Sequence, residues 1–152
     1  MSKENNDRLK VQSTAFNNGG QIPSKYTCEG ENINPEIEIS SIPENTRSIA
    51  LIVEDPDAPR GVYDHWIVWN IPPNETIPEN SRPGVSGKNS FGNTSYGGPC
   101  PPSGSHRYFF KVYALDRELD IAAGSDKQKL KEAMKDHVLG SGELMGHYQK
   151  RK

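Results

Sequence analysis

Two segments rich in proline and glycine, residues 55–59 and 98–108, constrain the fold of this sequence most strongly. Each adjoins an apolar run typical of a β-strand, residues 47–55 in the first case and 107–115 in the second. Each segment also carries aspartate, histidine or tyrosine side chains, which titrate or form hydrogen bonds. Rigid loops that hold such groups beside a sheet commonly build small polar pockets, so the pattern predicts a sheet with a site at its rim.

Short strands separated by polar connections explain most of the remaining pattern. Residues 49–53 are continuously apolar, which fits a strand buried on both faces. Residues 72–104 form a long loop, and a loop of that length in a compact domain is usually functional. Strands that precede a single late helix predict a mainly β protein, an antiparallel sandwich with a Greek-key sheet. The predicted strands are residues 9–14, 36–40, 47–55, 65–71, 107–115 and 143–149.

One helix is defined by the sequence near the C-terminus. Ser125 and Gln128 have the spacing of a capping box, and apolar side chains then recur at helical intervals from Leu130 onward. The periodicity reaches residue 138, and Gly140 would end the helix. His137 falls on the apolar face, where we interpret it as a packed core or interface histidine.

Length and composition favour one domain over residues 1–152, with residues 1–8 as a flexible N-terminal tail. The formal net charge is −2 and no basic face is clustered, which argues against nucleic-acid binding. No stretch approaches the ~20 apolar residues of a membrane span. Because the first residues are polar and lack a signal-peptide core, we expect a cytoplasmic protein.

The two cysteines, Cys28 and Cys100, both lie in predicted loops. They are too few for a disulfide framework or a zinc cluster, and we predict neither a metal nor another cofactor. A single bridge stays open, but in a cytoplasmic protein we expect reduced, half-buried thiols. Whether the Ala58–Pro59 peptide bond is cis also stays open.

Strand alternation brings several polar side chains toward one rim of the sheet. His106 and Tyr108 share a face at the start of their strand, and Asp55 ends the buried strand. His65 begins the strand between them and, by the same alternation, would share a face with Ile67. Three strand ends can therefore each deliver a polar group, although the sequence alone does not show that they meet.

If these ends meet, they form a pocket that could bind an anion. Asp57 would add a second carboxylate, and protonated histidine, the tyrosine hydroxyl and loop N–H groups would contact the ligand. Gly97 and Gly98 would let the backbone approach it closely. Each residue also has a structural interpretation, because Asp55 and Asp57 suit Asx turns and His65 suits an ordinary half-buried position.

Together these residues resemble the phosphatidylethanolamine-binding protein family, also called Raf-kinase-inhibitor-like, in its short bacterial and archaeal form. The resemblance rests on residues 26–32, 55–59, 65–72, 98–108 and 142–146. It implies a large antiparallel sheet packed on a smaller one, and a pocket for phosphate-like groups, phosphorylethanolamine heads or small carboxylates. The longer C-terminal helix of eukaryotic members is missing, which leaves apolar residues for a homodimer seam. The implied pocket residues are Asp55, Asp57, His65, Gly98, Pro99, His106 and Tyr108.

Three functions follow as alternatives. The first is a non-catalytic binding protein for a small anionic or phosphorylated ligand. The second is an interaction module that inhibits a kinase or serine protease through residues 72–104. The third is a small hydrolase with Ser103, Ser105 or Cys100 as nucleophile and a pocket histidine as base, or with a metal on the pocket residues. No Gly-x-Ser-x-Gly elbow supports the third function, and Ser105 should point away from the neighbouring histidine.

Overall fold

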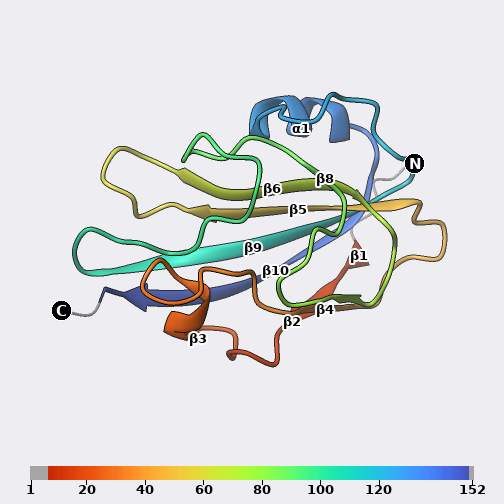
Figure 1. Cartoon of the computed structure of the whole chain (residues 1–152). Helices are drawn as coiled ribbons and strands as arrows, with labels where there is room; N and C mark the ends of the chain where they lie inside the picture. Colours follow the sequence, from red (N-terminus) through yellow and green to blue (C-terminus); the bar gives the residue numbers. More distant parts are fainter. Residues whose placement is uncertain (1–6, 151–152) are drawn as a thin grey trace.

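The structure is a computed structural model that describes residues 7–150, and it consists of two open β-sheets and one α-helix (Figure 1). The large sheet has the strand order β1-β10-β9-β5-β6-β8, and β3 pairs with β10 beside β1. The small sheet has the order β2-β4-β7. The elements are β1 (Asp7–Arg8), β2 (Lys10–Gln12), β3 (Gly20–Gln21), η1 (Ser24–Tyr26), β4 (Ile37–Ser40), β5 (Ser48–Asp55), β6 (Tyr63–Ile71), β7 (Thr76–Ile77), β8 (Val85–Ser86), β9 (Ser105–Leu115), α1 (Lys127–Met134) and β10 (Val138–Gln149).

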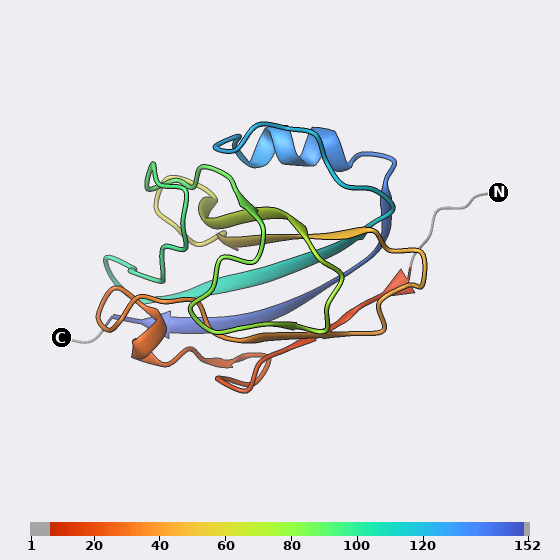
Figure 2. The same ribbon diagram turned by 45° about the vertical axis from the view of Figure 1, so that its right-hand side comes forward.

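The large sheet is the middle layer of the molecule. The small sheet covers one face and α1 lies over the other, as the two views show (Figures 1 and 2). Leu51 and Val53 of β5 face the small sheet, whereas Ala50 and Ile52 face α1. Every residue of β5 is buried, because both faces of this central strand are covered. The prediction of a mainly β, two-sheet sandwich with a buried strand at residues 47–55 is confirmed.

The connection from β6 to β9 makes the large sheet a Greek-key type. Residues 72–104 leave β6, add β7 to the small sheet and β8 to the edge of the large one, and return to form β9 on the other side of β5. The segment predicted as one long loop therefore contains two short strands. No helix among residues 7–150 is long and apolar enough to cross a membrane.

The helix is shorter than the periodicity predicts. Its N-cap is Asp126, whose carboxylate accepts the N–H of Lys129 (3.0 Å), so the predicted capping box of Ser125 is wrong. The helix ends at Met134, because Asp136 adopts a left-handed conformation (φ 70°). The predicted last turn instead starts β10, which pairs with β9 along nearly its whole length. Leu130 and Met134 pack in the core as predicted.

The N-terminal segment also differs from the prediction in part. Residues 7 and 8, which were assigned to a flexible tail, form β1 and pair in parallel with β10. Leu9 follows and is buried between the sheets. The rest of the predicted tail lies outside the described residues. No cis peptide bond occurs within the described chain, so the Ala58–Pro59 bond is trans.

A β-bulge in β6 changes which side chains face the site. Val53 pairs with Trp66 and Glu54 pairs with Asp64, so His65 is one extra residue between two successive pairs. Ile67 packs under α1, but His65 lies on the other face. The predicted shared face of His65 and Ile67 is therefore wrong, because simple alternation does not hold across a bulge.

Candidate functional site: a polar pocket at one end of the large sheet

A cavity of about 150 Å³ lies where β5 ends and where β6 and β9 begin. Loops on either side complete it, one after β5 and one before β9. The rim predicted from strand alternation is therefore a single site, and four of the seven predicted residues line it. The lining residues are Asp55, Ala58, Pro59, Tyr63, His65, Phe91, Cys100, Pro101, Pro102, His106 and Tyr108.

Asp55 and His106 form a buried pair at the base of the cavity. Nδ1 of His106 donates to Oδ2 of Asp55 (2.7 Å), and Oδ1 of Asp55 accepts the N–H of Asp57 (2.7 Å). Both carboxylate oxygens are thus engaged, and the aspartate fixes the orientation of the imidazole. Nε2 of His106 has no partner among residues 7–150, so it is free to meet a ligand.

His65 supplies the second imidazole of the cavity, and a backbone carbonyl fixes the orientation of its ring. Its Nδ1 donates to the carbonyl oxygen of Gly97 (2.7 Å), the backbone of Gly98 lies nearby, and its Nε2 makes no hydrogen bond of good geometry with the described residues. Burial lowers the pKa of His65, although the Gly97 carbonyl and the charge of Asp55 partly oppose this effect. The neutral ring therefore carries its proton on Nδ1 and a lone pair on Nε2.

Tyr108 lies between the two imidazoles. Its ring meets His65 edge-on, with centroids 5.2 Å apart, and stacks on His106 at 6.4 Å. The hydroxyl is buried and lies near the carboxylate of Asp55 and the backbone of Cys100, but its hydrogen-bond geometry with both is poor. Burial and the nearby charge of Asp55 raise the pKa of Tyr108, so the hydroxyl keeps its proton and remains a donor.

Aromatic side chains form the outer wall of the cavity. Phe91 packs edge-on against Tyr63 and His65, with ring centroids 5.0 Å and 5.3 Å away, and remains 41% exposed. The buried amide of Asn89 holds this loop, because it donates to the carbonyls of His65 and Ser95 and accepts the N–H of Phe91 (3.0 Å). The cavity therefore has a polar base and an apolar mouth.

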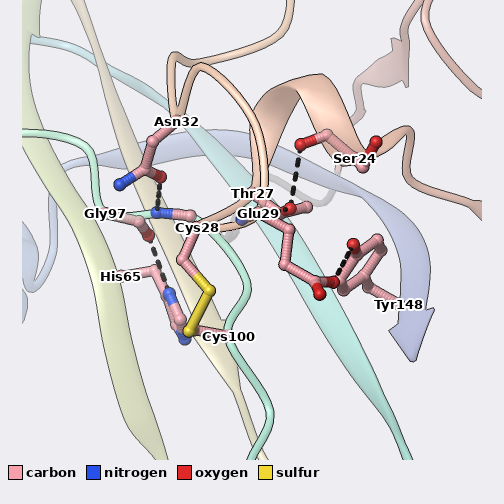
Figure 3. The surroundings of a disulfide bond; sticks show 10 residues. Ser24, Thr27, Cys28, Glu29, Asn32, His65, Gly97, Cys100 and Tyr148 are labelled. Atoms are coloured by element: carbon pink, nitrogen blue, oxygen red, sulfur yellow. Dashed lines mark hydrogen bonds between the residues drawn. A yellow bond between two sulfur atoms is a disulfide. The ribbon is translucent and has the colours of Figure 1, made fainter. Parts of the chain in front are cut away.

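A disulfide joins Cys28 to Cys100, so the expectation of reduced thiols is wrong (Figure 3). The two loops are already aligned, since the N–H of Cys28 donates to the carbonyl of Pro99 (3.1 Å). Their Cα atoms lie 5.5 Å apart, a usual separation for a bridge. Cys100 also lines the cavity, and the disulfide thus anchors one wall of it to the loop after η1.

Gly98 and Pro99 do not line the cavity. The N–H of Gly98 donates to the side chain of Asn32 (2.8 Å), so in this structure it is engaged within the protein. A β-carbon on Gly98 would lie 2.2 Å from the carbonyl oxygen of Tyr26, which explains why glycine is needed in this close contact. Both residues act as structural support for the wall that carries Gly97 and Cys100.

Asp57 also lies outside the cavity and supports it. Its carboxylate accepts three hydrogen bonds from Arg107, two from the guanidinium (2.8 Å and 2.9 Å) and one from the backbone N–H (2.9 Å). These bonds lower the pKa of Asp57 to about 2, so the group is ionised at neutral pH. The ion pair ties the loop after β5 to the start of β9.

The hydrolase alternative loses its candidate nucleophiles. Cys100 is part of the disulfide, and Ser103 and Ser105 are exposed and absent from the cavity lining. Among residues 7–150, no cluster of three or more histidine, cysteine, aspartate or glutamate side chains could hold a metal ion.

His137, predicted on the helix, instead follows it, and its Nδ1 donates to Asp116 (2.9 Å).

Sequence reasoning missed the supporting residues of the site. Asn32, Tyr63, Asn89 and Phe91 carry no local signal, because each acts through contacts with residues far away in the sequence. The one hint was the length of the segment 72–104, which contains Asn89 and Phe91.

Comparisons with known proteins agree with this fold. The sequence model of the phosphatidylethanolamine-binding protein family matches residues 12–149. The chain is 47% identical over 150 residues to the UPF0098 protein of Methanothermobacter thermautotrophicus, covering 93% of this chain and 99% of that protein. Two crystal structures are similar: a phosphatidylethanolamine-binding protein homologue of Chlamydia trachomatis (41% identity, TM-score 0.92, coverage 95% and 99%) and YbcL of E. coli (30%, 0.86, 95% and 99%). This chain therefore belongs to the phosphatidylethanolamine-binding protein family.

Proposed function

We propose that this protein is a non-catalytic binding protein for small oxyanions, in particular phosphate-like or phosphorylethanolamine-like ligands. The buried hydroxyl of Tyr108 carries the proposal, because it has no good partner in the described chain and borders the cavity. A buried donor without a partner is rare in folded proteins and usually marks a place for a ligand or a water molecule. An oxyanion supplies the acceptor that this hydroxyl lacks.

The charges around the cavity support an anion of small size. A protonated His106 remains paired with Asp55 through Nδ1 and offers its second N–H to the ligand. Hydrogen bonds from His106 and the N–H of Asp57, one to each oxygen of Asp55, reduce the repulsion between this carboxylate and an anionic ligand. The volume of about 150 Å³ suits a phosphate-sized head with a short substituent.

The lining favours binding over covalent catalysis. Apart from the two tyrosines, the lining residues of the cavity supply no hydroxyl or thiol, because Cys100 is bonded to Cys28. An imidazole paired with a carboxylate can act as a base, but nucleophilic catalysis also needs an activated group within its reach. The Asp55–His106 pair is therefore assigned to orienting a donor.

The test is a titration of the protein with O-phosphorylethanolamine and with inorganic phosphate, followed by the ring signals of the histidines in NMR spectra. His106→Asn keeps a donor for Asp55 but lacks the second nitrogen, so we expect at least about tenfold weaker binding. His137→Asn is the matched control, because His137 also donates Nδ1 to an aspartate, at the other end of β9. Equal weakening in both variants, or no saturable binding to the wild type, would refute the proposal.

Protein interaction is a second candidate function, favoured by exposed large apolar side chains, one of which, Phe91, lines the cavity. Phe91 and Val62 are the large apolar side chains of the described chain that are most exposed, at 41% and 51%. Phe91 belongs to the segment 72–104, through which kinase or serine-protease inhibition was predicted. Inhibition of a protease and kinase panel by the wild type, lost in Phe91→Ser, would support this function. The homodimer and the cytoplasmic location stay predictions.

A further inference from the structure

We propose that His65 is the specificity-determining residue of the pocket, and that it selects oxyanions that still carry a proton. The preferred ligands are then monoanionic phosphate and phosphomonoesters, and fully deprotonated oxyanions such as sulfate are rejected. This inference rests on the proposed function and names the ionisation state of its ligand.

The contact with Gly97 fixes the chemistry of the ring. A carbonyl oxygen only accepts hydrogen bonds, so Nδ1 of His65 must carry a proton to make its 2.7 Å contact with Gly97. On a neutral ring, Nε2 then holds a lone pair and can only accept. Gly97 is not part of the cavity lining whereas His65 is, so the opposite edge of the ring is the one available to a ligand.

The groups facing His65 favour the neutral ring. From β5 the charged group is Asp55, from β6 the groups are Asp64 and Tyr63, whose ring lies 5.3 Å from that of His65, and from β9 the titratable groups are His106 and Tyr108. Both oxygens of Asp55 are engaged elsewhere, and Asp64 forms an ion pair with Lys127 (2.7 Å). Burial therefore dominates and holds the pKa of His65 below its ordinary value.

The cavity then offers a ligand both hydrogen-bond donors and an acceptor. The hydroxyl of Tyr108 donates, Nε2 of a protonated His106 donates, and Nε2 of His65 accepts. A dianion offers only acceptors, so one of its oxygens would face the lone pair of His65 in a buried site. A monoanionic phosphomonoester has one P–O–H group, and monoanionic inorganic phosphate has two; one such group donates to His65 while unprotonated oxygens accept from Tyr108 and His106.

The charge balance points to the same ligand. No lysine or arginine lines the cavity, so among its described lining residues only histidine is able to carry positive charge. Arg107, the nearest guanidinium in the sequence, is committed to Asp57. One imidazolium that is already paired with Asp55 compensates a second ligand charge poorly.

The first experiment compares three ligands on the wild-type protein between pH 5 and pH 8. The phosphate group of O-phosphorylethanolamine, a phosphomonoester, loses its last proton near pH 6. 2-Aminoethylphosphonate has nearly the same shape but a higher second pKa, and sulfate has no proton to lose in this range. We expect sulfate to bind on the order of 10- to 100-fold more weakly than the phosphomonoester at pH 5.5, the range for an unsatisfied buried acceptor.

The pH dependence separates the ligand's proton from the protein's protons. If the monoanion is the bound form, the pH at which affinity begins to fall will be higher for the phosphonate than for the phosphomonoester, in the order of their second pKa values. If only protein groups matter, both curves will fall at the same pH. Coincident curves, or sulfate within about twofold of the phosphomonoester, would overturn the inference while leaving oxyanion binding intact.

Matched variants show which imidazole ring is responsible for the preference for phosphomonoester over sulfate. His65→Asn keeps a donor for Gly97 but lacks Nε2, so the preference for phosphomonoester over sulfate should fall at least tenfold. His106→Asn should weaken both ligands by similar factors and leave their ratio unchanged. If His65→Asn does not fold, as judged by its amide spectrum, the wild-type curves still decide. Absence of binding by all three ligands would refute the proposed function and this inference together.

Discussion

Replacing Cys28 and Cys100 together with serine should lower the free energy of unfolding by about 4 kcal/mol. The two cysteines are 72 residues apart in the sequence, so the bridge closes a loop of nearly half the chain. The loop-closure entropy lost by the unfolded chain at this length corresponds to about 4.4 kcal/mol at 25 °C. The folded state changes less, because the N–H of Cys28 still donates to Pro99 and Gly98 still donates to Asn32.

The assay is urea unfolding followed by tryptophan fluorescence, since Trp66 and Trp69 are both buried. With a denaturant dependence of about 2 kcal/mol per molar urea, the midpoint should move down by about 2 M. Wild-type protein in reductant should unfold at the same midpoint as the double serine variant. This comparison isolates the cross-link from the effect of the serine side chains themselves.

Two results would refute this reasoning. The first is a double serine variant whose stability lies within about 0.5 kcal/mol of the oxidised wild type, because the loop-entropy argument would then have no role. The second is a thiol titration that finds both cysteines free in protein purified without reductant, because the bridge would then be absent under ordinary conditions.

Three further changes test other parts of the structure. Asp57→Asn should cost about 1 kcal/mol at pH 7, as expected for a half-exposed ion pair. Arg107 lowers the pKa of Asp57 from 3.8 to about 2, so this stabilisation is present above pH 4, and urea unfolding of both proteins should converge as the pH falls to 2. Asn89→Ala should speed hydrogen exchange of the Phe91 amide, because that amide loses its acceptor. Leu130→Ala should destabilise the protein by about 2–5 kcal/mol in the same unfolding assay, because the side chain of Leu130 is fully buried between α1 and the large sheet.

The sequence could predict those parts of the fold that depend on local pattern. The continuous apolar run in β5 and the regular alternation in β9 appear in the structure as a central strand and a strand with Tyr108 and Phe110 facing the small sheet. His106 and Tyr108 were placed together correctly for the same reason. Period-two alternation is a property of one strand, so it needs no knowledge of the partner strand.

The helix and the last strand were harder to delimit because their patterns overlap. Apolar residues from Leu130 to Val138 fit a helical period, yet the helix ends at Met134, Lys135 already has a non-helical backbone, and β10 begins at Val138. We infer that the free energy gained by pairing β10 with β9 over many residues is larger than that of one more helical turn. That gain depends on tertiary contacts, which override local propensity.

The disulfide was missed for a different reason. Its prediction depended on an assumed reducing compartment, not on any pattern around Cys28 or Cys100. In the structure, the loops that carry them are brought together by backbone and side-chain contacts such as those of Asn32 and Pro99. Contacts between loops that lie this far apart in sequence leave no periodic signal.

At the bulge of His65, the regular alternation of a strand does not predict which side chain faces the cavity. Without the extra residue, alternation would turn His65 toward the α1 side with Ile67, and the cavity would hold one imidazole instead of two. The bulge also sets the ring against Tyr108 and aligns Nδ1 with the carbonyl of Gly97. Gly97 belongs to the same loop as Cys100, so the disulfide, the loop and the bulge together fix which edge of His65 is turned away from Gly97. The proposed selection of a ligand would therefore depend on strand register and loop support as much as on the side chains that line the cavity.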